Sequence, residues 1–304
     1  MAVDGGPHGW LVIDKPLGLS SNRVVEIVRR STGTKVGHAG TLDPLATGVL
    51  PIAIGEATKT SAYAMTGRKR YRFRVRWGVA RTTDDREGEI IGECECRPSS
   101  EAIEAILPRF IGAISQTPPA YSAIKVNGRR AYTLARANAP AALPSRPVEI
   151  ATLRLIAMPD RDHTDCEALV GKGTYIRALV RDLGEALGTL AHVAELRRLS
   201  VGRFTEAQAI SLDSLDEDRH SLAKAGHLLP IETALDDIPA LALTGAEAAR
   251  LRSGQRVTPG DSGERADPDR LDEGMVVSAW HDQALIALAR IENGGLRPLR
   301  VINR

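Results

Sequence analysis

The alternation of hydrophobic and polar positions predicts short strands and amphipathic helices along most of the chain. The apolar run from Trp10 to Ile13 predicts a strand, which ends at the turn KPLG. Ser20 or Ser21 can cap the helix that follows, because apolar residues then recur at helical spacing until Gly33. A second helix is predicted within residues 100–112, where isoleucine, leucine and phenylalanine recur with the same period.

The clearest helical pattern lies in the second half of the chain. Thr174 is a candidate N-cap, and the helix should end near Gly188. Its apolar face is formed by Ile176, Leu179, Val180, Leu183 and Leu187. By contrast, the stretch from Thr117 to Leu143 is rich in Pro, Ala, Asn and Arg and has little periodicity. It therefore predicts a mobile excursion from the core.

The pattern of residue types along the chain changes after about Asp237, where a small C-terminal domain is expected to begin. The elements predicted there are a helix from Thr244 to Leu251, a loop rich in Gly, Asp and Pro from Gly254 to Gly274, and strands at Met275 to Trp280 and Ala284 to Ala289. We therefore predict two domains, residues 1–236 and residues 237–304.

Residues 37–51, GHAGTLDPLATGVLP, combine small and apolar residues with Gly and Pro, which predicts a shaped loop. Its only ionisable side chains are His38 and Asp43. The glycines permit positive φ and close backbone approach, and Pro44 biases Asp43 away from helical conformations. The absence of GxGxxG or GK[ST] argues against a dinucleotide loop or a P-loop. Asp43 alone fits an Asx turn as well as a catalytic carboxylate.

Residues 59–81 contain many arginines and no Asp or Glu, which is the strongest charge asymmetry of the sequence. From Arg70 to Trp77, arginines alternate with Tyr71 and other apolar residues, and a strand sends alternate side chains to opposite faces. Arg72 and Arg74 are therefore candidate phosphate contacts beside aromatic groups that can stack on RNA bases. The alternative is a half-exposed strand with solvated arginines.

The composition is that of a globular protein with a sizeable core, because 43% of the residues are hydrophobic and 26% are charged. A formal net charge of +2 does not by itself indicate nucleic acid. No secretory signal is evident, and no apolar stretch reaches the roughly 18 residues of a membrane span. Three cysteines without metal-type spacing predict reduced thiols in a cytoplasmic protein.

Several ordered stretches resemble the TruB-type tRNA pseudouridine synthases. The loop GHAGTLDPLATGVLP resembles the family signature, in which the Asp of LDPLATG is the indispensable catalytic residue; that residue is Asp43 here. The stretches IDKPLG, KRYR, GKGTYIRALVRDLG and LRRLSVG agree in order and spacing. Together they cover roughly residues 8–204. The tail resembles a small RNA-binding domain of the PUA type.

The resemblance implies a pseudouridine synthase fold of the α+β class. In this fold a mixed, mostly antiparallel central sheet is flanked by helices and loops, and a small β-rich, PUA-like domain follows. It also implies that the T-loop uridine of tRNA, position 55, is flipped out and isomerised without cofactor or metal. The expected partner is the T-loop and T-stem of tRNA, with no membrane and as a monomer. Residues 117–145, with Lys125, Arg129 and Arg130, resemble the mobile thumb that grips the RNA.

The same resemblance implies three catalytic residues. Pseudouridine formation asks for a carboxylate against the ribose, and Asp43 is compatible with acting there as a nucleophile or as a base. Arg177 is implied to pair with Asp43, which a guanidinium fork can do in a bidentate manner. Tyr175 is implied to contact the base and to assist transfer of the C5 proton. Without the resemblance, a solvated arginine and a packing tyrosine are the simpler interpretations.

The remaining expected residues contact substrate. The resemblance assigns base stacking to Tyr71, an apolar wall of the uracil pocket to Leu196, filling of the gap left in the RNA to His38, and backbone or phosphate contacts to Lys15 and Lys59.

Two other functions remain open from the residues alone. A glycosidase also attacks an anomeric carbon, but it needs two cooperating carboxylates, and the loop offers only Asp43. A non-enzymatic RNA chaperone would use the arginine strand and the C-terminal domain, and in such a protein Asp43 would be dispensable.

Overall fold

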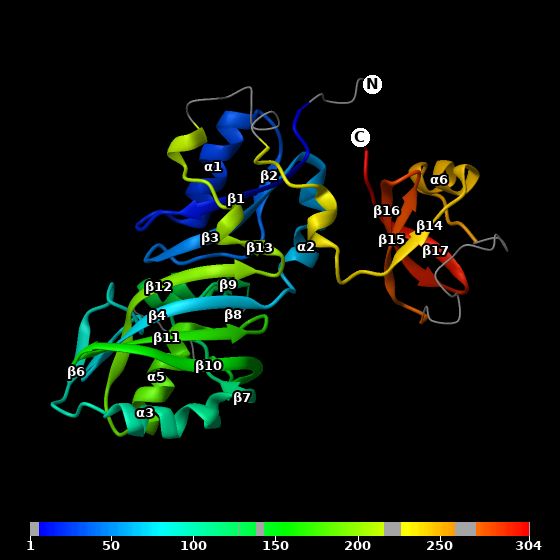
Figure 1. The fold of residues 1–304 in the computed structure, drawn as a ribbon. Helices are drawn as coiled ribbons and strands as arrows, with labels where there is room; N and C mark the ends of the chain where they lie inside the picture. The colour runs from blue at the N-terminus through cyan, green and yellow to red at the C-terminus, as the bar shows by residue number, and fades with distance from the viewer. Residues whose placement is uncertain (1–5, 127, 138–142, 216–225, 259–271, 304) are drawn as a thin grey trace.

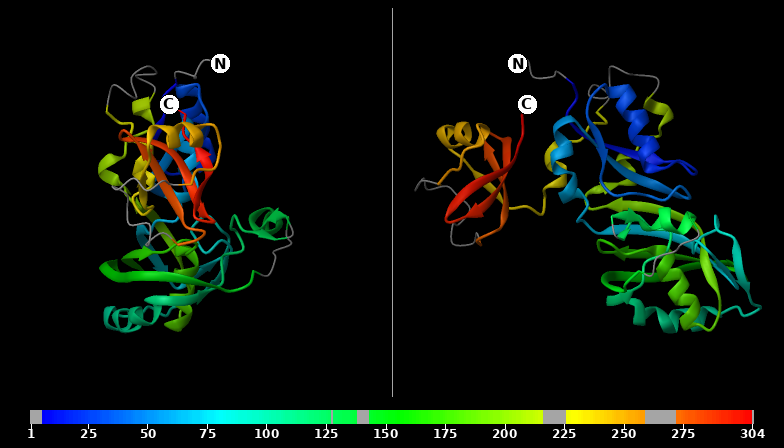
Figure 2. Two further views of the ribbon diagram at one scale, coloured as in Figure 1. Left: turned by 90° about the vertical axis from the view of Figure 1, so that its right-hand side faces the viewer. Right: turned by 180° about the vertical axis from the view of Figure 1, so that it is seen from behind.

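The chain forms a large body built on one sheet and a smaller body with its own sheet (Figure 1). The computed structural model describes residues 6–126, 128–137, 143–215, 226–258 and 272–303. The smaller body lies beside the part of the large body that contains α1 (Ser21–Thr32) and α2 (Ser61–Ala64), as Figures 1 and 2 show.

The large sheet has nine strands and is mixed, mostly antiparallel, which confirms the predicted α+β class. Its strands are β1 (Gly9–Lys15), β2 (Val36–His38), β3 (Ala46–Ile54), β4 (Lys69–Trp77), β7 (Gly112–Gln116), β10 (Arg146–Asp160), β11 (His163–Val170), β12 (Ala191–Val201) and β13 (Phe204–Thr205). The main path runs β1-β3-β12-β4-β11-β10-β7, with β2 paired to β3 and β13 to β12. Among these described strands, the pairing of β3 with β12 alone is parallel.

The predicted alternation along β4 is confirmed. Phe73, Val75 and Trp77 are at most 1% exposed, whereas the arginines between them are exposed or half-buried. The apolar face of β4 packs against α5 (Ile176–Ala186), whose leucines belong to the same core cluster. Burial of each such side chain contributes about 1.5–3 kcal/mol, so this contact fixes α5 on one face of the sheet.

The helix ends are explained by local chemistry. The Ser20 hydroxyl caps α1 by accepting a hydrogen bond from the Arg23 N–H at 3.2 Å, and Gly33 ends the helix with φ +66°, both as predicted. The helix predicted within residues 100–112 is α3 (Ser100–Ile106), which continues as the 3₁₀ turn η2 (Leu107–Phe110). Pro108 lacks the N–H that an α-helix would need there.

The predicted N-cap of α5 is wrong by one residue. Tyr175, in extended conformation, occupies the N-cap, and no side chain caps this helix. The hydroxyl of Thr174 instead donates to the Glu149 carbonyl at 3.4 Å. The remaining short 3₁₀ turns of the described chain are η1 (Gly55–Thr60), η3 (Glu206–Gln208), η4 (Asp213–Leu215) and η5 (Ile231–Ala234).

Two segments predicted to be irregular contain regular structure. Both ends of residues 37–51 belong to the sheet, as parts of β2 and β3, so that the loop itself is short. Residues 117–145 contain the hairpin of β8 (Lys125–Val126) and β9 (Arg129–Arg130), followed by α4 (Ala131–Arg136). Gly128 with φ +80° supplies the tight turn of this hairpin, which periodicity does not reveal. Residues 127 and 138–142 of this segment lie outside the described residues.

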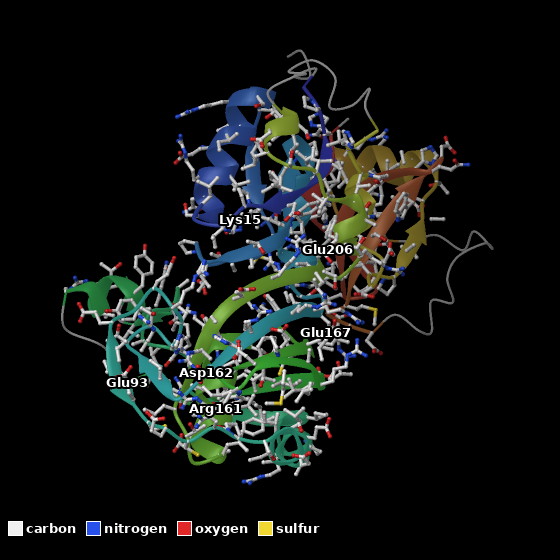
Figure 3. The ribbon with its side chains drawn as sticks, turned by 60° about the vertical axis from the view of Figure 1, so that its left-hand side comes forward. Lys15, Glu93, Arg161, Asp162, Glu167 and Glu206 are labelled. Atoms are coloured by element: carbon white, nitrogen blue, oxygen red, sulfur yellow. The ribbon has the colours of Figure 1, made fainter. Side chains whose placement is uncertain are left out.

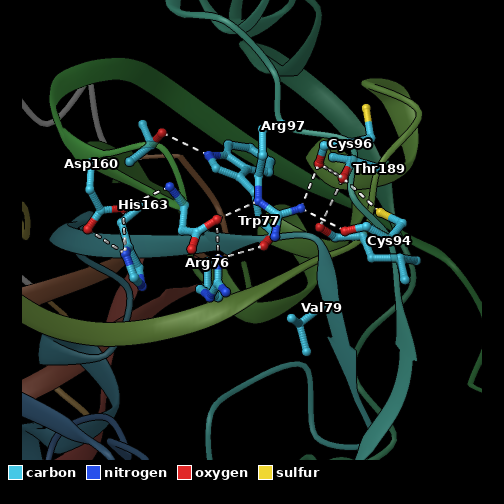
Figure 4. Close-up of polar contacts among 12 residues, drawn as sticks. Arg76, Trp77, Val79, Cys94, Cys96, Arg97, Asp160, His163 and Thr189 are labelled. Carbon is cyan, nitrogen blue, oxygen red and sulfur yellow. Dashed lines mark hydrogen bonds and ion pairs between the residues drawn. The ribbon is translucent and has the colours of Figure 1, made fainter.

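A network of polar contacts lies at the end of the sheet that contains the β10–β11 turn and the last residues of β4 (Figure 4). The Arg97 guanidinium donates to Asp162 at 2.6 Å and to the Cys94 carbonyl at 2.7 Å. Asp162 also pairs with Arg76 of β4 at 2.9 Å. Arg97 thereby fastens the irregular segment that follows the hairpin of β5 (Val79–Arg81) and β6 (Ile90–Glu93) to the β10–β11 turn.

The C-terminal body is β-rich, as predicted. Its sheet has the order β14-β15-β16-β17, formed by β14 (Ala240–Ala242), β15 (Val276–His281), β16 (Ala284–Glu292) and β17 (Gly295–Val301). The predicted helix is α6 (Gly245–Arg252), and Thr244 and Glu247 form a capping box at its start. Of the loop predicted at residues 254–274, residues 259–271 lie outside the described residues.

The two bodies share a hydrophobic cluster. Leu288 and Ile302 of the small body belong to the same cluster as Trp10 and Phe204 of the large one. Lys59 adds a polar link, because its Nζ donates to the Val301 carbonyl at 2.7 Å. In the described part of the chain, no helix is long and apolar enough to cross a membrane.

Gly48 generates a prediction about how β3 and β12 fit together. Its φ is +97°, and an added Cβ would overlap the Arg198 backbone carbonyl oxygen, well inside normal van der Waals contact. We expect Gly48→Ala to lower the free energy of unfolding by roughly 2–6 kcal/mol, since backbone strain and overpacking each cost about 1–3 kcal/mol.

Urea denaturation of Gly48→Ala against Gly33→Ala measures this effect. Gly33 has φ +66° and no atoms near the site of an added Cβ, so the control isolates backbone strain at about 1 kcal/mol. Equal losses of stability in the two variants would contradict the crowding at Gly48.

Candidate active site

The loop between β2 and β3 holds Asp43 in a fixed conformation. The Ser21 hydroxyl brackets Leu42, accepting from its N–H at 2.8 Å and donating to its carbonyl at 3.0 Å. Leu42 and Leu45 are at most 3% exposed, so the residues around Asp43 are anchored in the core. The carboxylate between these anchors keeps 37% of its side-chain exposure.

Arg177, at the start of α5, holds the Asp43 carboxylate. One Arg177 Nη lies 2.8 Å from an Asp43 Oδ, and the guanidinium side chain is only 4% exposed. The other Nη lies 3.5 Å from Asp85. The guanidinium also donates to the Thr83 and Tyr121 carbonyls, each at 2.9 Å. The predicted pairing with Asp43 is therefore confirmed, but the predicted bidentate geometry is not, because the fork is shared among four acceptors.

A pocket of about 300 Å³ opens in front of this ion pair. Among the described residues that line it, Asp43 is the only acidic side chain. Its cationic side chains are Lys69, Lys172, Arg177 and Arg198. The surplus of positive charge favours an anionic ligand or a reaction in which negative charge develops.

Three of the other predicted residues line the same pocket. Tyr71 from β4, Leu196 from β12 and Tyr175 at the start of α5 meet there, although they are distant in sequence. Tyr71 is half-buried, and Leu196 is 7% exposed. The Arg146 guanidinium carbon lies 5.3 Å from the centre of the Tyr175 ring, within cation–π range. The pocket thus presents aromatic and aliphatic surfaces beside one carboxylate.

The structure contradicts the expected RNA contact of Lys15, which Figure 3 labels at the end of β1. Lys15 is 0% exposed, and its Nζ donates to the carbonyls of Pro16, Leu19 and Pro44 at 2.7–3.3 Å. Burial lowers the pKa of Lys15 to about 8, and the nearby Asp43 carboxylate partly opposes this shift. Lys15 therefore supports the loop that carries Asp43.

Lys59 and His38 lie outside the pocket lining. The Lys59 ammonium is bound by Glu56 at 2.6 Å and by the Val301 carbonyl, at the junction of the two bodies. His38, in β2, has a buried Nδ1 without a hydrogen-bond partner among the described residues. Burial, reinforced by the Arg198 charge, lowers the pKa of His38, so the imidazole is neutral at neutral pH. RNA contacts of both residues stay predictions.

Arg72 and Arg74 point to the opposite face of the sheet from Tyr71, because side chains alternate along a strand. Arg74 is held by Asp165 at 2.7 and 2.9 Å, and Arg72 lies 3.6 Å from Glu167 of the neighbouring strand β11. Figure 3 labels Glu167 on β11. This geometry favours the alternative of a half-exposed strand whose arginines are paired. Any phosphate contact of these arginines would have to lie away from the pocket.

Sequence reasoning missed Lys69, Arg198 and Asp85. Arg198 is 1% exposed and donates to the Val49 and Gly40 carbonyls, which ties β12 to β3 and to the loop that carries Asp43. Burial lowers the pKa of Lys69 to about 8, with smaller contributions from Arg198 and Lys172. Both residues stand within the stretches KRYR and LRRLSVG that carried the family resemblance. No pattern in the sequence pointed to Asp85, which meets Arg177 only in the fold.

The described residues contain no group of three or more His, Cys, Asp or Glu side chains arranged to hold a metal ion.

Known proteins resemble this chain in sequence over nearly its whole length. Residues 28–176 match the N-terminal domain of the TruB family pseudouridylate synthases, and residues 177–236 match the tRNA pseudouridylate synthase B C-terminal domain. The tRNA pseudouridine synthase B of Rhodospirillum rubrum is 52% identical over 297 residues, 97% of this chain and 96% of that protein. The protein of the same name from Caulobacter vibrioides is 50% identical over 295 residues, 96% of this chain and 95% of that one.

Solved structures support the fold. The chain superimposes on Cbf5 in an archaeal box H/ACA sRNP Nop10-Cbf5 complex with a TM-score of 0.73 and 23% identity, covering 97% of this chain and 86% of that one. A Cbf5-Nop10-Gar1 complex gives a TM-score of 0.74 and 24% identity, covering 97% and 85%. At these identities the likeness concerns the fold.

Proposed function

The chain belongs to the TruB family of pseudouridylate synthases, and we propose that it isomerises the T-loop uridine of tRNA, position 55, to pseudouridine. The observation that carries this proposal is the pocket in which a single carboxylate, Asp43, is held by Arg177 between aromatic and aliphatic walls. Its volume, about 300 Å³, suits one small ligand such as an everted nucleotide.

The reaction rearranges one nucleotide without net oxidation. The N1–C1′ glycosidic bond breaks, the uracil turns, and a C5–C1′ bond forms in its place. The proton on C5 then leaves, and N1 gains one, so the atoms balance without a cofactor. Asp43 acts on the ribose, either as the nucleophile at C1′ or as a base on the sugar. Both routes need a carboxylate that is aimed at the ribose, and the Arg177 contact at 2.8 Å holds Asp43 in one orientation.

The walls of the pocket supply binding and orientation. Tyr71 stacks on the everted uracil, and Leu196 covers its other surface. Tyr175 contacts the base and assists removal of the C5 proton. The cationic residues of the pocket stabilise negative charge on the uracil once its bond to the ribose has broken. His38, neutral at neutral pH, is suited to stack in the RNA where the base has left.

The alternatives explain the pocket less well. A glycosidase needs a second working carboxylate. Asp85 shares the Arg177 guanidinium with Asp43, but it is 3% exposed and does not line the pocket. A chaperone without catalysis would have no use for a half-exposed carboxylate gripped by a buried arginine. Remodelling of the tRNA elbow is nevertheless compatible with the enzyme, because the base has to be unstacked to reach Asp43.

The proposal extends to the rest of the chain. Residues 1–236 act as the catalytic domain, and residues 237–304 as a small PUA-like domain that contacts the same tRNA. Residues 117–145, which contain Lys125 and Arg129, close over the T-loop and T-stem. The protein acts as a cytoplasmic monomer.

Asp43→Asn tests whether the chain is an enzyme or a binding protein. Asn can satisfy the turn before Pro44 but is neither a useful nucleophile nor a base, so product formation should be lost essentially completely. Affinity for T-loop RNA should stay within about tenfold of the parent, or roughly 1.4 kcal/mol. Release of tritium from C5-labelled uridine in T-loop RNA, with no cofactor added, measures the product.

Two controls make this assay decisive. Asp237→Asn removes an exposed carboxylate elsewhere and should leave activity unchanged. A transcript with cytidine at position 55 should release no tritium. Turnover of Asp43→Asn near the parent rate would reduce Asp43 to a turn residue. Release from the cytidine transcript would instead reject the T-loop site.

Tyr71 separates stacking from chemistry at the base. We expect Tyr71→Phe to be active and Tyr71→Ala to be impaired about 5- to 150-fold, because aromatic stacking is worth about 1–3 kcal/mol per base. Steady-state rates at subsaturating T-loop RNA measure both variants. A Phe variant as poor as the Ala variant would mean that the hydroxyl, and not the ring, is required.

A further inference from the structure

The side-chain amide of Gln116 hydrogen-bonds to both the backbone N–H and the backbone carbonyl of Tyr175, the tyrosine at the start of α5. Its Oε1 accepts a hydrogen bond from the Tyr175 N–H at 2.9 Å, and its Nε2 donates to the Tyr175 carbonyl at 3.2 Å. The Gln116 residue is 1% exposed, and it does not line the pocket. A side-chain amide thus forms the pair of bonds that a neighbouring strand would otherwise make.

Tyr175 needs such an external support. It is the N-cap of α5, in extended conformation, and no side chain caps this helix. Because the direction of a side chain follows from its backbone, the two bonds from Gln116 help to fix where the Tyr175 ring enters the pocket. The Tyr175 carbonyl also accepts the first hydrogen bond of α5, from the Leu179 N–H at 3.0 Å, whereas Gln116 is the acceptor for the Tyr175 N–H. Loss of the amide would therefore leave that N–H without its hydrogen bond.

The segment that begins at Gln116 makes two further contacts with α5. The Thr117 carbonyl accepts from Arg181 at 2.8 Å, and the Tyr121 carbonyl accepts from Arg177 at 2.9 Å. Gln116 itself is the last residue of β7, which pairs with β10. Three hydrogen-bonding points within six residues therefore join the end of the sheet to α5 and its N-cap, and two of them reach the pocket residues Tyr175 and Arg177.

We propose that Gln116 is a positioning residue that acts through Tyr175. It also attaches the start of the segment 117–145 to the active site. The proposal rests on the proposed isomerase activity. Its consequence is that loss of the amide slows the chemical step while RNA binding is kept, since misplacement of a reacting group by about 1 Å can cost about 100-fold in rate.

Gln116→Met keeps the length of the side chain and removes both hydrogen bonds. Under saturating T-loop RNA we expect kcat to fall about 10- to 100-fold, with the RNA Kd within about threefold of the parent. Ser115→Ala is the matched control, because Ser115 lies in the same strand and is exposed, and its hydroxyl contacts the Ser145 hydroxyl at 2.6 Å rather than Tyr175. It should retain the parent kcat.

Gln116→Glu supplies a readout that a merely structural role would not move. A protonated carboxyl can accept from the Tyr175 N–H and donate to its carbonyl, as the amide does, whereas a carboxylate can only accept. Burial should raise the pKa of this new Glu above its usual value of about 4.3. The ratio of variant kcat to parent kcat should therefore approach one at low pH and fall as pH rises through that pKa.

The outcomes discriminate clearly. A Gln116→Glu ratio that is independent of pH, or a Gln116→Met defect confined to Kd, would overturn the proposal. If Gln116→Met does not fold, the pH dependence of Gln116→Glu still decides. If the parent protein modifies a tRNA uridine outside the T-loop, the same ratios are measured on that uridine, so failure of the T-loop assignment is seen separately.

Discussion

The buried guanidinium of Arg177 is the constraint around which the active site is organised. A cation that is 4% exposed needs acceptors on several sides, because an unpaired buried charge is very costly. Arg177 finds them in Asp43, Asp85 and two backbone carbonyls, which come from three separate segments of the chain. These segments are therefore held together by the same group that fixes the orientation of the Asp43 carboxylate.

The sheet brings those segments within reach of one another. The parallel pairing of β3 with β12 sets Leu196 and Arg198 beside the end of the catalytic loop, and Gly48 permits the close approach. The antiparallel pairing of β12 with β4 then places Tyr71 in the same pocket. Lys15, fully buried, ties the turn after β1 to the Asp43 loop, because its Nζ donates to the carbonyls of Pro16, Leu19 and Pro44. Much of the positive charge near the pocket thus has a structural task besides its electrostatic one.

The sequence could predict the parts of the structure that depend on local chemistry. The cap at Ser20, the end of α1 at Gly33 and the alternation along β4 follow from short-range rules, and the structure agrees with them. The family resemblance named the ion pair of Asp43 with Arg177. What could not be predicted depends on contacts between distant residues. Arg177 lies 94 residues from the Thr83 carbonyl and 56 from that of Tyr121, and no local pattern records such contacts. The arginines of β4 show the same limit, because their carboxylate partners stand on other strands.

The rate of pseudouridine formation by Arg177→Lys under saturating T-loop RNA tests most directly whether the Arg177 guanidinium organises the site. Lysine keeps the positive charge but has a single ammonium, which cannot serve Asp43, Asp85 and two carbonyls at once. We expect a fall in rate of at least about 100-fold, with RNA affinity within about tenfold of the parent. A rate within about threefold of the parent would contradict the claim that the shape of the guanidinium, and not its charge alone, organises the site.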